Sequence, residues 1–198
     1  MVITNIEKNK GKIYSVYVDD KISFEISEYV LIKLDINIGM ELTEKELDLI
    51  KNQVLISMAK NDAINFISYK IRTAHEVEIK LREKYPNGVI EETVSFLNEN
   101  GYLNDELYAE RFINEKKKLG KLSKKELAYK LMEKGLKKDL INKVIDKMEY
   151  VETEYAQRIV SKINKVRNKK EEAHIKSYLY RKGFSKDTID EIMNTKKD

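Results

Sequence analysis

The sequence predicts a mainly α-helical protein, built from three tandem three-helix repeats that follow a small N-terminal module containing a β-hairpin. Three observations predict this class. Charged residues make up 36% of the chain, with only one proline and seven glycines, a composition typical of helices with solvated outer faces. A set of three amphipathic helices recurs at a period of about 47 residues, in the range of stacked helical arrays. The first 55 residues contain β-branched runs instead.

The N-terminal module, residues 1–55, is predicted to contain a β-hairpin. Residues 13–18 and 22–26 are rich in β-branched and aromatic side chains, and the second run alternates with a period of two. Such alternation indicates one buried face. Residues 2–6 could add a third strand, and Ser27 has the character of an N-cap for a short helix.

A long helix is predicted to join this module to the helical body. Thr43 and Glu46 have the spacing of a capping box, in which hydroxyl and carboxylate satisfy free backbone N–H groups at the helix start. Apolar residues continue from there with helical spacing. We expect the three repeats, which resemble helix-turn-helix units, to span residues 56–103, 104–151 and 152–198.

The second helix of the repeat carries the most regular motif. Residues 73–81 and 123–131 share Ser/Thr-x-x-Glu, followed by two apolar residues four positions apart. The capping box starts the helix, and the apolar residues face a core. In two repeats a Lys-Gly pair ends this helix, where Gly135 and Gly183 accept the left-handed conformation of a C-cap.

Two repeats depart from the motif. The first has Tyr85-Pro86 in place of the glycine turn, so its turn must differ. The third has Glu171 and His174 at the capping-box positions, and its second helix could start a turn earlier, at Asn168.

The joint between the first two repeats is the most specific segment. Gly101 can end one helix with a positive φ, and Asn104 can cap the next. Asp105 suits the positive end of that helix, and Leu103 can pack onto Tyr108. The structural joint therefore comprises Gly101, Leu103, Asn104, Asp105 and Tyr108, together with Gly135 and Gly183.

These motifs resemble the RecX family of regulators of the RecA recombinase, of the type with an N-terminal extension found in low-GC Gram-positive bacteria. The resemblance rests on Gly-Tyr-Leu-Asn-Asp-x-x-Tyr-Ala at residues 101–109, on the second-helix start and on the Lys-Gly turn, and covers essentially the whole chain. It implies an elongated, curved array that lies along the RecA filament on single-stranded DNA. There the family mostly inhibits ATP hydrolysis and strand exchange, in homologous recombination, DNA repair and the SOS response.

Positive charge gathers in the second and third repeats. The net charge is +4, yet residues 1–58 are net negative, whereas 105–151 and 152–198 are each net positive. A partner carrying phosphates or acidic side chains would be drawn there. The candidate contact residues lie mainly in or beside the turns between first and second helices: Arg72, Arg111, Lys117, Lys118, Lys121, Lys124, Lys125, Lys165, Arg167, Lys169, Lys170 and Arg181.

The sequence gives less support to other functional classes. A repeat-built DNA- or RNA-binding regulator is the alternative, but lysine suits phosphates better than base edges. Some tyrosines could stack on bases, but at helical spacing most are better explained as core or interface residues; they are Tyr102, Tyr108, Tyr129, Tyr155, Tyr178 and Tyr180.

The sequence contains no nucleotide-binding, nucleophile or metalloenzyme motif, and His75 and His174 have no partner at metal-ligand spacing. We therefore expect no enzyme activity, cofactor or metal. With no cysteine and no apolar run of about 20 residues, we expect a cytoplasmic protein with no membrane contact. We also expect a monomer that binds DNA directly but weakly.

Overall fold

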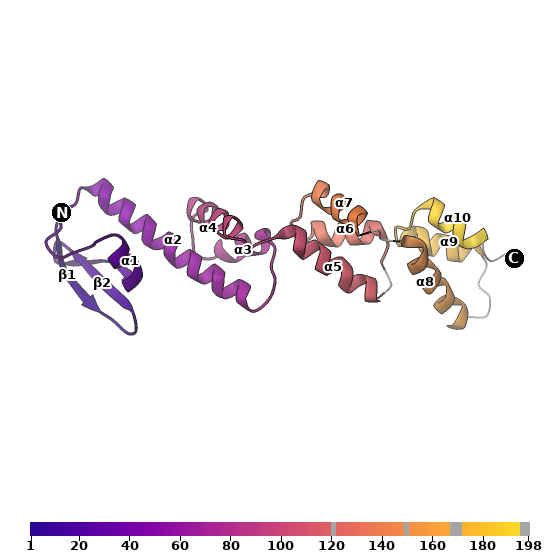
Figure 1. The fold of residues 1–198 in the computed structure, drawn as a ribbon, viewed down its shortest axis with the longest axis horizontal. Coiled ribbons are helices and arrows are strands. Elements are labelled where there is room, and N and C mark those ends of the chain that lie inside the picture. The colour runs from indigo at the N-terminus through magenta and orange to yellow at the C-terminus, as the bar shows by residue number, and fades with distance from the viewer. Residues whose placement is uncertain (120–121, 149–150, 167–171, 195–198) are drawn as a thin grey trace. The chain divides into compact units, whose positions relative to one another are not determined.

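The computed structural model of the chain describes residues 1–119, 122–148, 151–166 and 172–194 (Figure 1). In these ranges it contains ten helices and one three-stranded sheet. Two compact units are present: residues 1–70 with 77–102, and residues 71–76 with 103–198. The prediction of a mainly helical protein with a small N-terminal β module is confirmed.

The N-terminal module is an antiparallel sheet in the order β1 (Ile3–Lys8), β2 (Ile13–Val18), β3 (Lys21–Ser27). Asp19 and Asp20 have φ values of 46° and 63°, as a tight hairpin turn between right-twisted strands requires. The short helix α1 (Glu28–Lys33) follows, and Ser27 caps it by accepting a hydrogen bond from the backbone of Val30. The predicted hairpin, third strand and cap are all present.

The long helix α2 (Glu44–Ser68) begins at the predicted capping box. Thr43 Oγ1 accepts from the Glu46 backbone N–H at 3.3 Å, and the Glu46 carboxylate accepts from Thr43 N–H at 2.8 Å. The helix packs Leu47 and Val54 into the core of the sheet module, and then contacts α4. The expected boundary between residues 55 and 56 therefore falls inside one continuous helix.

The first helix triplet consists of the C-terminal half of α2 with α3 (Ala74–Leu81) and α4 (Asn87–Glu99). Its buried side chains include Val77 and Leu81 from α3 and Leu97 from α4. Residues 71–76, which include the start of α3, belong to the second unit.

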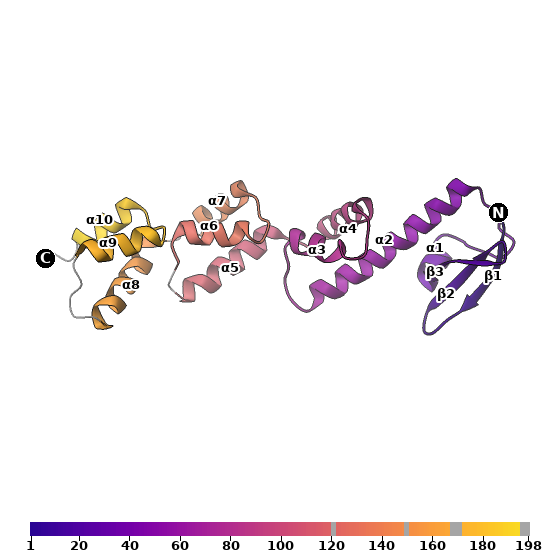
Figure 2. The ribbon, with the colours of Figure 1, turned by 180° about the vertical axis from the view of Figure 1, so that it is seen from behind.

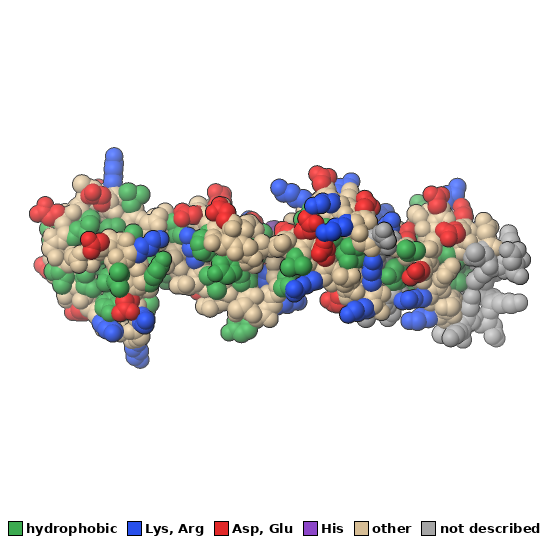
Figure 3. Space-filling view, in the orientation of Figure 1, with side chains coloured by type: hydrophobic (Ala, Val, Ile, Leu, Met, Phe, Trp, Pro, Cys, Tyr) green, Lys and Arg blue, Asp and Glu red, His purple; other side chains and the backbone are tan. Residues whose placement is uncertain are grey.

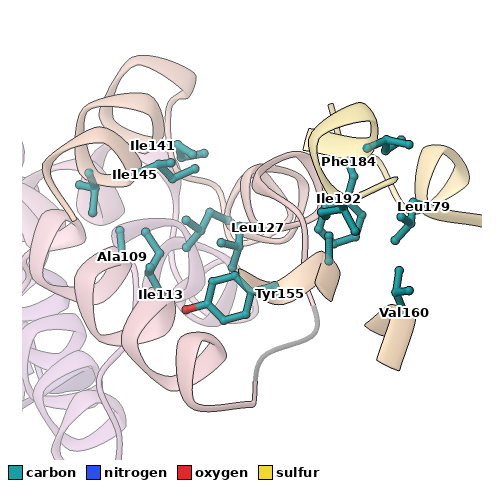
Figure 4. Close-up of a cluster of buried hydrophobic side chains, with 14 of the residues drawn as sticks. Ala109, Ile113, Leu127, Ile141, Ile145, Tyr155, Val160, Leu179, Phe184 and Ile192 are labelled. Carbon is teal, nitrogen blue, oxygen red and sulfur yellow. The ribbon is translucent and has the colours of Figure 1, made fainter. Parts of the chain in front are cut away.

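Two further triplets follow: α5 (Asp105–Leu119), α6 (Lys124–Met132) and α7 (Lys138–Lys147), then α8 (Glu152–Val166), α9 (Glu172–Arg181) and α10 (Lys186–Asn194) (Figure 2). Asn168, a candidate start of the last second helix, lies outside the described residues. One continuous hydrophobic cluster runs through both triplets, as shown by Ala109, Ile113, Leu127, Ile141, Ile145, Tyr155, Val160, Leu179, Phe184 and Ile192 in Figure 4. None of the described helices is long and apolar enough to cross a bilayer.

Candidate functional site

The start of each motif-bearing second helix is bonded to the glycine turn of the following repeat. At the first such contact, Thr73 Oγ1 donates to the carbonyl oxygen of Lys134 at 2.8 Å. Lys134 Nζ in turn donates to Glu76 Oε1 at 2.7 Å. The capping box of one repeat thus holds the Lys-Gly turn of the next, and we call this arrangement the latch. All its residues belong to the second unit.

The second latch repeats the first atom for atom. Ser123 Oγ donates to the carbonyl oxygen of Lys182 at 2.7 Å, and Lys182 Nζ lies 3.4 Å from Glu126 Oε1. Ser123 is fully buried, as is Thr73 at the first latch. Each box hydroxyl therefore has two roles: it accepts from the backbone of its own helix and donates to the following repeat.

An acidic residue at the start of the first helix completes the latch in the second and third repeats. Asp105 Oδ1 accepts from the backbone N–H of Ala74 at 3.0 Å, and Glu152 Oε1 accepts from that of Lys124 at 2.7 Å. Each carboxylate thus lies at the N-terminus of the preceding second helix, where the helix dipole favours negative charge. Asn104, in contrast, caps its own helix by accepting from Leu107 N–H at 2.8 Å.

Glycine at the two turns is required by close approach as well as by φ. Gly135 and Gly183 have φ values of 81° and 82°. A Cβ at Gly135 would lie 2.2 Å from His75 Cβ, and one at Gly183 would lie 3.1 Å from Lys125 Cβ. Gly101 has a φ of 71°, but a Cβ there would meet nothing within 4 Å. Of these three glycines, Gly135 at the first latch therefore has the least space for a side chain.

The latch explains why the first repeat lacks the glycine turn. The first repeat follows the N-terminal module, so its turn receives no capping box from a preceding repeat. There Tyr85 Oη and Lys84 Nζ both donate to Asp62 Oδ2, at 3.0 and 2.9 Å, within the same repeat. Burial, and then the hydrogen bond to Asp62, raises the pKa of Tyr85 to about 12. In the last repeat, His174 replaces the capping-box glutamate.

The charged groups of the first latch, Glu76 and Lys134, each stabilise the charged form of the other. Burial by itself would raise the pKa of Glu76, but hydrogen bonds from Lys134 and the Thr73 backbone, with the charges of Lys134 and Arg72, hold it below its ordinary value. The hydrogen bond to Glu76 raises the pKa of Lys134. Arg72, a candidate contact residue, is half-buried beside this pair.

The structure divides the candidate basic residues into exposed and structurally engaged groups. Lys117 is half-buried, and its Nζ donates to the carbonyl oxygen of Met148 at the end of α7. Lys165 lies in α8. Lys121, Arg167, Lys169 and Lys170 lie outside the described residues. The exposed candidates are Arg111, Lys118, Lys124, Lys125 and Arg181.

These five exposed cations form no ion pair with any carboxylate in the described ranges. Other basic residues of the same repeats are neutralised. Lys143 and Lys147 of α7 pair with Glu106 of α5 at 2.8 and 3.3 Å, which holds the pKa of Glu106 below its ordinary value. In the space-filling view, Lys and Arg side chains gather over the α5 to α8 part of the chain (Figure 3). The five exposed cations are the candidate contact surface.

The tyrosines separate by exposure. Tyr108 and Tyr155 occupy equivalent core positions in α5 and α8, whereas Tyr102, Tyr129 and Tyr180 are more than half exposed. His75 lies against the glycine of the first latch. In the described part of the chain, no three His, Asp or Glu side chains are grouped as metal ligands.

Sequence reasoning found both halves of the latch but did not connect them. The available signal was that the box and the Lys-Gly turn are each present twice, offset by one repeat, with the turn missing from the first repeat and the box from the last.

Comparisons with known proteins identify relatives along the full chain. Residues 59–97 match the family model described as RecX, first three-helix domain, and residues 104–145 match RecX, second three-helix domain. Regulatory protein RecX of Caldanaerobacter subterraneus subsp. tengcongensis is 31% identical over 198 residues, covering 98% of this chain and 99% of the relative. The Clostridioides difficile protein of the same name is 27% identical, covering 98% and 94%. A crystal structure of regulatory protein RecX has a TM-score of 0.79 and 26% identity, covering 98% of both chains.

Proposed function

Since this chain belongs to the RecX family of regulatory proteins, we propose that it regulates RecA by binding along the RecA filament on single-stranded DNA. Bound there, it lowers ATP hydrolysis and strand exchange. The observation that carries the proposal is the 31% identity to a protein named Regulatory protein RecX over nearly the full length of both chains. The family is one of regulatory proteins rather than enzymes, so the chemistry affected is the partner's.

Two features of the structure support a filament as the target. Within the second unit, the two latches are built from the same hydrogen bonds, and this regularity favours a repeated contact with a target that itself repeats. Several weak contacts made at once then add to a high overall affinity. The exposed cations of the second and third repeats suit phosphates or acidic protein surface. We further propose that the protein acts in the cytoplasm as a monomer and binds DNA alone only weakly.

The first prediction concerns turnover. Adding the protein to RecA on single-stranded DNA is expected to lower the rate of ATP hydrolysis in proportion to the protein bound, while the protein alone hydrolyses none. A coupled ATPase assay measures both rates. RecA turnover that stays unchanged at excess protein would contradict the proposal.

Co-sedimentation separates this proposal from a DNA- or RNA-binding regulator. Binding to RecA filaments should persist at a salt concentration that removes the protein from naked DNA, because phosphate contacts weaken steeply with salt. If salt removes the protein equally from filaments and from naked DNA, the hypothesis of a DNA- or RNA-binding regulator is favoured.

The second prediction concerns the exposed cations. Replacing Lys118, Lys124 and Arg181 by alanine is expected to weaken filament binding and to lower the salt-dependence slope by about 2 to 3, roughly one per lost phosphate contact. Stability should change by less than about 0.5 kcal/mol, because these side chains are exposed. Anisotropy titrations at several salt concentrations measure the slope.

The matched control removes the same charge elsewhere. Lys10, Lys21 and Lys45 are exposed residues of the N-terminal part of the chain, and their replacement by alanine should leave filament affinity and slope unchanged. If both triple variants behave alike, the surface of α5 to α9 has no special part in binding.

A further inference from the structure

The first unit contains a groove that the proposed function does not use. It lies between α1 and α2, has a volume of about 370 Å³, and ends at Phe96 of α4. A second hollow of about 270 Å³ shares Val30, Ser57 and Asn61 with it, so the two run together along α2. Both α1 and α2 pack against β3, and the groove is the space left between them.

The floor of the groove is apolar, whereas its sides mix apolar residues with polar ones such as Gln53 and Asn61. Val30 and Ile56 form its buried base, at 4% and 2% exposure. Tyr29 at its edge is 70% exposed, and Met58 beside the second hollow is 48% exposed. Hydrophobic side chains are visible across this part of the chain in Figure 3. A hollow with exposed apolar edges is typical of a protein-binding surface.

The rim of the groove is positively charged. Lys12 from the turn between β1 and β2, Lys33 from α1 and Lys60 from α2 line it. Lys60 lies over the Phe96 ring at 4.3 Å and 3.9 Å from a carboxylate oxygen of Glu92, whereas the Lys33 side chain forms no ion pair with any residue that the structure describes. Glu28 is the acidic residue that lines the groove among those described, and it already accepts from Tyr14 Oη at 3.2 Å and pairs with Lys12 at 3.5 Å; Glu25 lines the adjoining hollow.

We propose that this groove binds a short acidic peptide segment of a protein partner. One apolar side chain of the segment would occupy the floor above Val30 and Ile56, and its carboxylates would meet Lys12, Lys33 and Lys60. Charge complementarity selects the occupant, because three lysines and one glutamate line the groove, whereas residues 1–58 as a whole are net negative. That acidic surrounding repels an extended polyanion such as DNA, whereas a short peptide needs to reach only the three lysines.

The test uses the full chain and a fluorescein-labelled peptide of twelve residues, in which two leucines four positions apart are set among aspartates and glutamates. Fluorescence anisotropy measures its binding. A second peptide carries asparagine and glutamine in place of the acids, and a third carries serine in place of the leucines. We expect the acidic, leucine-containing peptide to bind at least tenfold more tightly than either.

Two variants place the site in the groove. Lys12→Glu with Lys33→Glu reverses charge at the rim, and Ser57→Leu fills the hollow from α2; each should weaken peptide binding at least tenfold. The matched control, Lys10→Glu with Lys21→Glu, makes the same charge change at exposed positions outside the groove and should keep wild-type affinity. Circular dichroism and thermal melting verify that all variants fold.

Three results would overturn the proposal: no preference for the acidic peptide, equal affinity in the groove and control variants, or displacement of the peptide by a thymidine oligonucleotide that binds more tightly. The last would make the groove a phosphate site. Since the assay contains no RecA, failure here leaves the regulation of RecA untouched, and failure of the turnover experiment leaves this groove untouched.

Discussion

Replacing Gly135 by alanine is expected to open the first latch and to lower the free energy of unfolding by about 3 to 4 kcal/mol. Alanine at a positive φ costs about 1 to 2 kcal/mol by itself. The added Cβ would also lie 2.2 Å from His75 Cβ, which is fixed to the backbone and cannot rotate away. The turn must therefore move, and two hydrogen bonds are lost, from Thr73 Oγ1 to the Lys134 carbonyl oxygen and from Lys134 Nζ to Glu76, at about 1 kcal/mol each.

Gly101→Ala is the matched control for this prediction. Gly101 also has a positive φ, of 71°, but its Cβ would meet no atom within 4 Å, so only the conformational cost of about 1 to 2 kcal/mol is expected. Adding His75→Gly to Gly135→Ala removes the clashing atom and should recover part of the loss. Urea unfolding gives the energies, and hydrogen exchange at residues 71–76 reports the latch. Equal losses in the two alanine variants would show that close approach contributes nothing.

Glu152→Ala is expected to cost about 3 kcal/mol, the second largest effect. The Glu152 side chain is 8% exposed. One carboxylate oxygen accepts from the Lys124 backbone N–H, and the other accepts from Ser185 N–H at 3.3 Å and Thr188 Oγ1 at 3.1 Å. It therefore connects the starts of three helices, and its removal leaves partly buried donors unpaired, at about 1 to 3 kcal/mol each before relaxation.

The equivalent residue of the preceding repeat provides the comparison. Asp105 is shorter, and in the described structure it accepts a single hydrogen bond from outside its own helix, from Ala74 N–H. Asp105→Ala should cost about 1 kcal/mol, close to the loss of one N-cap. Chemical denaturation of both variants gives the two energies. A loss at Asp105 as large as that at Glu152 would show that the count of hydrogen bonds does not set the cost.

The surface lysines show what a count of charges along the sequence can and cannot predict. Counting charges along the sequence assigns net positive charge to the second and third repeats, but a count does not tell which lysines are paired. Lys134 and Lys182 are bonded to carboxylates 58 and 56 residues away in the chain. Lys117 caps the end of a helix 31 residues later. Which cations face solvent depends on helix packing, and no local pattern records it.

The sequence by itself determined the elements whose bonds close within a few residues. The capping boxes at Thr43 and Ser123, the hairpin and the helical repeat all follow from side chains and φ preferences within one turn of the chain, so spacing predicts them. The tertiary structure alone decided that each box also holds the next repeat's turn. The donor and acceptor of that bond are 61 residues apart at Thr73 and 59 at Ser123, and only the packing of separate helices brings them within hydrogen-bond distance.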